Sequence, residues 1–202
     1  MNQVHRYINF PKKLFNDPIS DLEKLIHNYE MKFNKFEMGH FRFPLSEISE
    51  KYYSWFHAEF QNIFIKDWEV FYTPPGGKLP IHSDGIQPFI DFIKFNYVYD
   101  GEKSLMSWYE LKQDIQLDSD QTGINTSYTP INENQVNLIY KSNMEKPSLI
   151  NAGKPHGMSN IENDKGRWCV CLIPCYKDKI NNGTSRIEFN DALSIFSKYI
   201  ES

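Results

Sequence analysis

The sequence lacks several features that mark common protein classes. It has no basic excess, because 22 Lys and Arg stand against 26 Asp and Glu, for a formal net charge of −4. General nucleic-acid-binding proteins usually carry an excess of positive charge, so we expect no nucleic-acid partner. No segment approaches the roughly 20 consecutive apolar residues that cross a bilayer. The first residues also lack the apolar segment of a secretory signal, and we therefore expect a cytoplasmic protein without a membrane partner.

Cysteine is scarce and confined to one place. Cys169, Cys171 and Cys175 lie close together near the C-terminus, and an odd count does not suggest a disulfide framework. One interpretation is a partial thiolate metal site. The favoured one places Cys169 and Cys171 on one face of a buried strand, where cysteine behaves as a small hydrophobic residue.

The hydrophobic and aromatic content is sufficient for one hydrophobic core. Hydrophobic residues make up 40% of the 202-residue chain and aromatic residues 15%, so one domain is expected. We divide it into a helical N-terminal support, a β-barrel core and a C-terminal helix, with these parts covering residues 1–62, 63–176 and 177–202.

Three helices are predicted around the barrel. Apolar residues recur at three- and four-residue steps from Ile19 to Phe33, which predicts a first helix beginning at Pro18. A second helix with an aromatic face is expected to begin near Ser46. The last helix is expected over residues 190–200, with Asn190 as its cap.

Short segments of alternating polarity, rich in aromatic and β-branched residues, predict the strands. They cover residues 62–73, 79–83, 89–99, 104–110, 135–140 and 167–173. Many short strands after two helices favour a mainly β fold with flanking α-helices, of the double-stranded β-helix type, a jelly-roll or cupin-like barrel. Short strands alone also fit other β-sandwiches.

Two polar side chains interrupt the apolar strand over residues 89–99. Alternation places Lys94 and Asn96 on one face and aromatic residues on the other. Such groups are unfavourable in a strand unless they face water or a polar pocket. They either point into the barrel and help to bind a cosubstrate or substrate, or they lie on a solvated edge strand, and the sequence favours neither.

A polar segment over residues 111–135 separates two predicted strands. It contains Asp118 to Gly123, which begins like a calcium-binding loop, but Thr129 stands where the last glutamate ligand belongs. An ordinary polar loop is therefore favoured. Segments of this kind often cover the mouth of a site, which makes residues 111–135 a candidate lid.

The strongest signal lies at His82 and Asp84, beside prolines and glycines that interrupt regular structure. In an extended chain, side chains two residues apart point to the same side, so both can reach one metal ion. His156, between Pro155 and Gly157, is the candidate third ligand. Two histidines and one carboxylate form the facial triad of non-haem Fe(II) oxygenases. The alternative is that these residues never meet.

An arginine completes the pattern. Arg167 follows His156 by eleven residues and opens an apolar run. Its planar guanidinium suits a carboxylate, which it binds in bidentate fashion. With the segment from Asn151 to Asn160, this pattern resembles the Fe(II)/2-oxoglutarate-dependent oxygenase superfamily over roughly residues 65–175. The aspartyl/asparaginyl β-hydroxylase-like branch is the most similar, and Lys94 would stand for its basic strand residue.

The resemblance implies a function and a set of roles. It implies that Fe(II) is held by the triad and that 2-oxoglutarate is the cosubstrate, with Arg167 pairing with its far carboxylate and Ser159 or Lys94 assisting. The implied reaction is hydroxylation of a C–H bond in an amino-acid side chain, protein-bound or free, or in a small metabolite, with release of succinate and CO2. The expected partner is therefore a small-molecule or peptide substrate.

Two other classes of function use the same ligands. A non-catalytic cupin-like protein would bind metal without turnover. A metal-dependent hydrolase or isomerase would act without O2 or 2-oxoglutarate. Neither needs a carboxylate-binding side chain at the position of Arg167, which favours the oxygenase.

Overall fold

The computed structural model describes residues 4–84, 91–112, 128–177 and 186–201. Most of their regular structure is β-strand. The strands are β1 (His5–Tyr7), β2 (Gly39–Arg42), β3 (Ile63–Thr73), β4 (Lys78–Asp84), β5 (Ile93–Tyr99), β6 (Leu105–Leu111), β7 (Tyr128–Pro130), β8 (Val136–Asn143), β9 (Ser148–Asn151), β10 (His156–Ser159) and β11 (Arg167–Tyr176).

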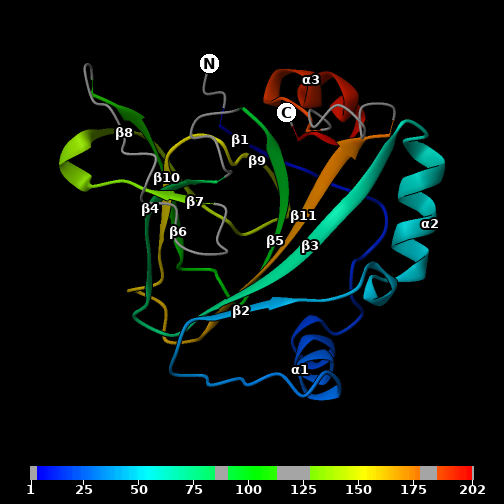
Figure 1. The fold of residues 1–202 in the computed structure, drawn as a ribbon, viewed down its shortest axis with the longest axis horizontal. Coiled ribbons are helices and arrows are strands. Elements are labelled where there is room, and N and C mark those ends of the chain that lie inside the picture. The colour runs from blue at the N-terminus through cyan, green and yellow to red at the C-terminus, as the bar shows by residue number, and fades with distance from the viewer. Residues whose placement is uncertain (1–3, 85–90, 113–127, 178–185, 202) are drawn as a thin grey trace.

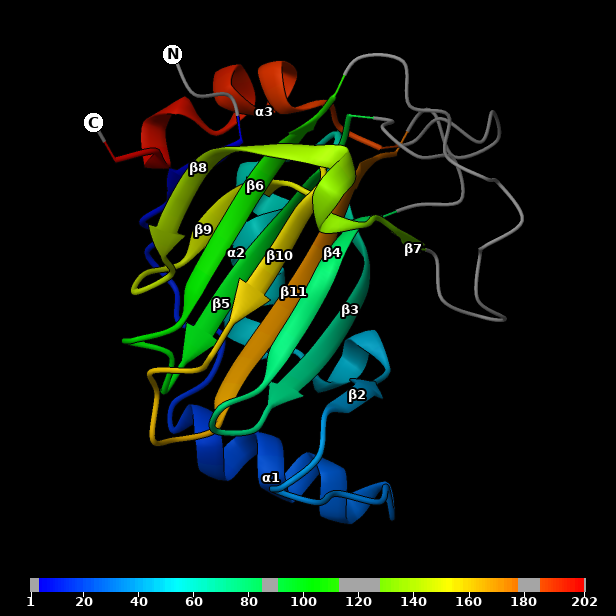
Figure 2. The same cartoon turned by 90° about the vertical axis from the view of Figure 1, so that its left-hand side faces the viewer.

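These strands form two antiparallel sheets within the described residues. A six-stranded sheet has the order β1-β9-β5-β11-β3-β2, and a five-stranded sheet has the order β7-β4-β10-β6-β8. The two sheets lie face to face (Figures 1 and 2). Apart from β2 and β3, the neighbours in both sheets are not consecutive strands of the chain, as in a jelly-roll topology. The predicted double-stranded β-helix with flanking helices is confirmed.

Three helices lie against the outer face of the six-stranded sheet, the face turned away from the five-stranded sheet (Figure 1). They are α1 (Pro18–Asn28), α2 (Glu50–Glu59) and α3 (Phe189–Ile195). The largest apolar cluster fills the space between the helices and this sheet, and it includes Leu22, Phe56 and Phe189 from the helices and Val70, Phe95 and Leu172 from the strands. The main core therefore lies outside the barrel.

The helix bounds differ from those predicted. Helix α1 ends at Asn28, and Glu30 has a positive φ of 51°, so the apolar residues up to Phe33 continue the pattern without continuing the helix. Helix α2 begins at Glu50, because the Ser49 hydroxyl accepts a hydrogen bond from the Tyr52 backbone and a short 3-10 turn precedes it.

The C-terminal helix was also predicted too long. Helix α3 starts at Phe189 after Glu188, so Asn190 lies inside the helix and does not cap it. A 3-10 turn over Ser197–Tyr199 follows in place of further α-helix. Strand β11, by contrast, runs beyond the predicted end to Tyr176, because a register shift between Ile173 and Pro174 accommodates the proline.

The inner face of the six-stranded sheet, turned toward the five-stranded sheet, is polar. In β5, Phe95 and Tyr97 join the helical core, while Lys94 and Asn96 face inward and are buried. Because β5 lies between β9 and β11, the solvated-edge interpretation of Lys94 and Asn96 is wrong. Alternation along β11 likewise sends Arg167 inward. Every second residue of these central strands therefore lines the barrel.

The candidate lid and calcium loop fall mostly outside the described residues, which omit 113–127 and hence Asp118 to Gly123. Of the rest of that segment, Ile131 packs against Ile81 and Val136. The lid stays a prediction, as does the division of the chain at residues 62 and 176. Among the described helices, none is long and apolar enough to cross a membrane.

Candidate metal centre

Two neighbouring strands of the five-stranded sheet bring the predicted triad together. His82 and Asp84 lie at the C-terminal end of β4, and His156 is the first residue of β10. The antiparallel register places His156 directly opposite His82. The end of β4 is fixed by two hydrogen bonds, from the Ser83 hydroxyl to the Gly153 carbonyl at 2.7 Å and from the Asp84 backbone to the Ala152 carbonyl at 3.0 Å.

The ligand atoms of the triad lie within 4.8 Å of one another. His82 Nε2 is 3.5 Å from Asp84 Oδ1, and His156 Nε2 is 3.9 Å from Asp84 Oδ2. The two imidazole centroids are 4.4 Å apart. Both histidines are buried. The alternative in which these residues never meet is excluded by this geometry.

Both imidazoles are oriented for metal binding. His82 Nδ1 is 2.8 Å from the Pro80 carbonyl oxygen, and His156 Nδ1 is 2.8 Å from the Lys154 carbonyl oxygen. A carbonyl accepts only, so each Nδ1 carries the proton and each Nε2 keeps its lone pair for a ligand. Metal-binding histidines are usually held in this way by a second hydrogen bond. The donor set therefore fits a divalent metal with nitrogen and oxygen ligands.

Lys94 holds the remaining oxygen of the carboxylate. Its Nζ lies 2.8 Å from Asp84 Oδ2, and both side chains are largely buried. Burial alone would raise the pKa of Asp84, but the Lys94 ammonium and the two histidines outweigh it and hold that pKa well below its usual range. Burial likewise opposes the charge on Lys94, and Asp84 more than offsets this, so the Lys94 pKa is raised. Asp84 is therefore ionised and oriented.

Burial also determines the charge of His156. Removal from water, together with the neighbouring charge of His82, lowers the pKa of His156 to about 4. The imidazole is consequently neutral at ordinary pH. A neutral imidazole is the form that binds a metal.

Arg167 lies on the inner face at the start of β11 and is 4% exposed. Its Nε donates a hydrogen bond to Ser104 Oγ at 3.1 Å, and the Ser104 hydroxyl in turn donates to the Gly101 carbonyl at 2.7 Å. No carboxylate of the described residues forms an ion pair with Arg167. A buried guanidinium without a carboxylate partner is costly, so this position suits an anionic ligand.

Sequence reasoning missed Ser104 and named Ser159 or Lys94 as the residue that assists Arg167 in binding the cosubstrate. Ser159 ends β10, where alternation turns it away from the face that carries His156. The structure brings the hydroxyl of Ser104 to Arg167 instead. The turn at Asp100-Gly101 was the available signal, because serine commonly follows such turns to bond their backbone.

Two asparagines hold the connection that leads into Arg167. The fully buried Asn160 donates through Nδ2 to the carbonyls of Thr73, Pro74 and Lys165, at 3.0–3.3 Å. Asn163 ties the same connection to the Asp100 carbonyl at 2.6 Å. These bonds join the β10–β11 connection to the neighbouring turns. The sequence carried no distinct signal for them.

Further polar groups line the barrel near the triad. Asn96 Oδ1 is buried on this inner face without a hydrogen-bond partner among the described residues. Cys169 and Cys171 share the inner face of β11, with their sulfur atoms 3.7 Å apart. A hydrogen bond from the Cys171 thiol and the charge of Arg167 outweigh burial and lower the pKa of Cys169. This pair therefore faces the site, in addition to filling the strand as expected.

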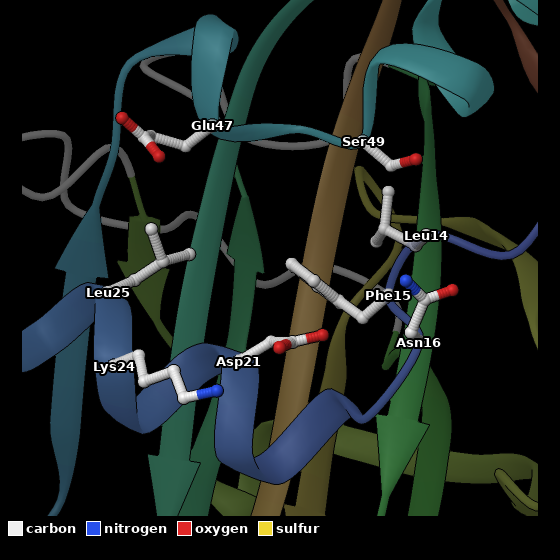
Figure 3. A pocket seen from close by; sticks show the side chains of 8 residues that line it. All are labelled: Leu14, Phe15, Asn16, Asp21, Lys24, Leu25, Glu47 and Ser49. Carbon is white, nitrogen blue, oxygen red and sulfur yellow. The ribbon is translucent and has the colours of Figure 1, made fainter.

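Two cavities lie elsewhere. One of about 360 Å³ lies between α1 and the segment before α2, as Figure 3 shows, and is lined by Leu14, Phe15, Asn16, Asp21, Lys24, Leu25, Glu47 and Ser49. Another of about 510 Å³ includes Lys12, Lys146 and Glu201 in its lining. Neither is lined by a residue of the triad, so both are separate from the metal centre.

Comparisons with known proteins show similarity of fold. No family model and no curated protein matches the sequence. The solved structure of EvdMO1 is similar, with a TM-score of 0.50 and 10% identity, over 84% of this chain and 46% of EvdMO1. The chain thus spans about half the length of that protein. At this level of identity the similarity concerns the fold alone.

Two further solved structures are related less closely in shape. One is HygX from Streptomyces hygroscopicus, solved with nickel and 2-oxoglutarate bound, with a TM-score of 0.44, 8% identity, and coverage of 79% of this chain and 78% of HygX. The other is SnoK, a non-haem α-ketoglutarate-dependent carbocyclase from nogalamycin biosynthesis, with a TM-score of 0.45, 9% identity, and coverage of 92% and 89%. The strand order of the two sheets gives this chain the double-stranded β-helix fold.

Proposed function

We propose that the protein is an Fe(II)- and 2-oxoglutarate-dependent dioxygenase that hydroxylates a C–H bond of an amino-acid side chain or a small metabolite. The observation that carries this proposal is the inward-facing set of His82, Asp84 and His156, with both imidazoles oriented through Nδ1 so that Nε2 is available. Such a set occupies one face of an octahedral metal and leaves positions open for other ligands.

In this proposal each nearby residue has one task. His82, Asp84 and His156 bind Fe(II), and Lys94 holds the second Asp84 oxygen so that the carboxylate keeps one orientation. Arg167 binds the far carboxylate of 2-oxoglutarate, and Ser104 orients its guanidinium. Fe(II) and 2-oxoglutarate together supply O2 activation, with release of succinate and CO2.

Arg167 distinguishes this function from the alternatives. A metal-dependent hydrolase or isomerase, or a metal-binding protein without turnover, needs no buried cation that lacks a carboxylate partner among the described residues. Only Lys94 supports the aspartyl/asparaginyl β-hydroxylase-like branch within this proposal. Its position in strand β5 resembles that of the basic strand residue of that branch. The substrate in that case is an amino-acid side chain, free or in a peptide.

The test is anaerobic titration of the metal-free protein with Fe(II) and then 2-oxoglutarate, followed by the weak visible charge-transfer absorption. We expect a band that needs both additions. His82→Ala removes a ligand and should abolish it, while His27→Ala, which alters an exposed histidine of α1, should leave it unchanged.

Arg167→Ala separates metal binding from cosubstrate binding. We expect Fe(II) binding to persist and 2-oxoglutarate binding to weaken by about 2–5 kcal/mol, because a buried charge partner is lost. Metal binding without any band in the unaltered protein would contradict the oxygenase and favour the metal-binding or hydrolase function. Normal 2-oxoglutarate affinity in Arg167→Ala would contradict the role of that residue.

A further inference from the structure

The inward side chains of β3 become less exposed to solvent along the strand. Its inward residues are Asp67, Glu69, Phe71 and Thr73, and alternation along the strand gives all four the same direction. Asp67 is exposed, Glu69 and Phe71 are half-buried, and Thr73 is buried. Access from solvent to the barrel interior along β3 is therefore at the Asp67 end, and Glu69 is the first partly buried group inward from it.

Among the described residues, the ion-pair partners of the Glu69 carboxylate lie on its solvent side. Its Oε1 lies 2.8 Å from Arg42 Nη2 and 3.6 Å from His40 Nε2. The Glu69 side chain is 12% exposed, whereas that of Arg42 is 63% exposed and comes from the edge strand β2. An ion pair with one partner so solvated contributes little, and its partner is readily exchanged for another cation.

The same row of the sheet offers a second hydrogen-bond acceptor. Glu69 lies opposite Cys171 in β11, and Cys171 lies opposite Asn96 in β5. Asn96 is 4% exposed, and its Oδ1 has no hydrogen-bond partner among the described residues. A buried acceptor of this kind is costly unless a ligand donates to it. A carboxylate and an amide oxygen therefore lie in one row, with only a thiol between them.

This row adjoins the metal centre. Lys94 lies two residues from Asn96 on the same face and bonds Asp84. Burial raises the pKa of Glu69, but hydrogen bonding from His40 and the charge of Lys94 outweigh it, so the net pKa is lowered. Glu69 is thus ionised and within electrostatic reach of Lys94. Beside it, the His40 ring stacks on Phe71 at 4.5 Å and 2°, which provides a planar wall.

We propose that Glu69 and Asn96 form a subsite for a cationic nitrogen of the substrate, a guanidinium or an ammonium group, which replaces Arg42 at the Glu69 carboxylate. This inference rests on the proposed function and names the substrate class that the same barrel admits. Both acceptors are satisfied by a group that carries several N–H donors and a positive charge. The substrate's cation lies in the row, and its reacting carbon lies toward His82, Asp84 and His156.

The test measures binding, so that it is independent of turnover. Anaerobic calorimetric titrations of the Fe(II)- and 2-oxoglutarate-treated protein use two matched pairs of probes, L-arginine against L-citrulline and L-lysine against L-norleucine. Each pair differs in the cationic group while the chain length is kept. We expect at least one cation to bind about 10–100-fold more tightly than its neutral counterpart, the range for hydrogen bonds to a charged group. The pair that discriminates identifies guanidinium or ammonium.

Two variants move the result in opposite directions. Glu69→Gln keeps the shape and removes the charge, and it should abolish the preference for the cation. Arg42→Met removes the competing cation and should tighten binding of the cationic probe severalfold. Lys198→Met is the matched control, because it removes the exposed partner of Glu59 on the helical side and should change nothing.

The outcomes decide between a subsite and a structural cross-strand pair. Equal binding within both probe pairs, absence of binding by both cations, or an unchanged preference in Glu69→Gln would overturn the proposal. Weaker cation binding in Arg42→Met would also overturn it, because Arg42 would then support the site and not compete for it. The charge-transfer band, recorded in the same samples, reports separately whether the proposed function fails.

Discussion

Lys94 Nζ lies 2.8 Å from Asp84 Oδ2, so a buried ammonium on the six-stranded sheet is paired with a carboxylate on the five-stranded sheet. The pair therefore links the two halves of the barrel at the point where the candidate metal ligands converge. Each charge is tolerated inside the protein because the other is present. This relationship makes the stability of the barrel depend on the same carboxylate that we propose as a metal ligand.

The first prediction concerns this pair. Lys94→Met leaves the Asp84 carboxylate buried without its main partner, and the metal-free protein should lose about 3–5 kcal/mol of unfolding free energy. Urea unfolding at neutral pH measures it. Lys94→Met combined with Asp84→Asn should recover most of the loss, because no uncompensated charge remains. A double variant as unstable as the single one would show that packing, and not charge, explains the effect.

The second prediction concerns the pH dependence of stability without metal. Burial lowers the pKa of both His5 and His156 to about 4. The nearby charge of Arg6 adds to this effect at His5, and that of His82 adds to it at His156. The pKa of a histidine in the unfolded chain is about 6.5. Between about pH 6.5 and about pH 4, the unfolded chain therefore binds more protons than the folded one. The stability is therefore complete above about pH 6.5 and falls as the pH drops toward 4.

Urea unfolding from pH 7 to 4.5 should show a loss of about 2–3 kcal/mol for each of these two histidines. In His5→Gln the contribution of His5 disappears, so the fall over this interval should be smaller by about that amount. His27→Gln, at an exposed position in α1, should leave the slope unchanged. A slope in His5→Gln as steep as in the unaltered protein would contradict burial of a neutral His5.

The third prediction compares two serines. Ser104→Ala removes the hydroxyl that accepts from Arg167 Nε, and the dissociation constant for 2-oxoglutarate should rise by about 3–10-fold, as for loss of one hydrogen bond. Fe(II) binding should not change. Ser159→Ala is the matched control and should leave both constants unaltered. A larger effect of Ser159→Ala than of Ser104→Ala would instead support Ser159 as the residue that assists Arg167.

The fourth prediction concerns the connection before Arg167. Asn160→Ala leaves the carbonyls of Thr73, Pro74 and Lys165 without their shared donor, and it should lower the unfolding free energy by about 1–3 kcal/mol. The affinity for 2-oxoglutarate should also fall, because Arg167 follows this connection. Asn34→Ala, which alters a local bond to the Phe36 backbone, serves as the control for loss of an asparagine. Equal stability of the two variants would contradict the role of Asn160.

Much of the candidate site was readable from local sequence. The spacing of His82 and Asp84 in an extended segment places both side chains on one face, whatever the rest of the fold. The alternation that separates Lys94 and Asn96 from Phe95 has the same origin. The choice of face could not be read in this way, since it depends on which side of β5 the helices cover.

The spacing of apolar residues did not predict where the helices end. Apolar residues up to Phe33 keep a helical spacing, but the chain leaves α1 at Asn28 and Phe33 instead packs against Tyr72 and Trp168. Periodicity reports which residues are buried, and burial against a sheet can be achieved without a helix. The ends of α1 and α3 were mispredicted for this reason.

The sequence by itself determined the mainly β composition, the candidate metal-ligand set and the arginine, because these depend on residue types and on short-range backbone geometry. Only the tertiary structure decided that Ser104 meets Arg167, that Lys94 meets Asp84, and that Glu69 shares a row with Asn96. These contacts join segments that strand order and register bring together. Register is set by the packing of whole sheets, and no short stretch of sequence specifies it.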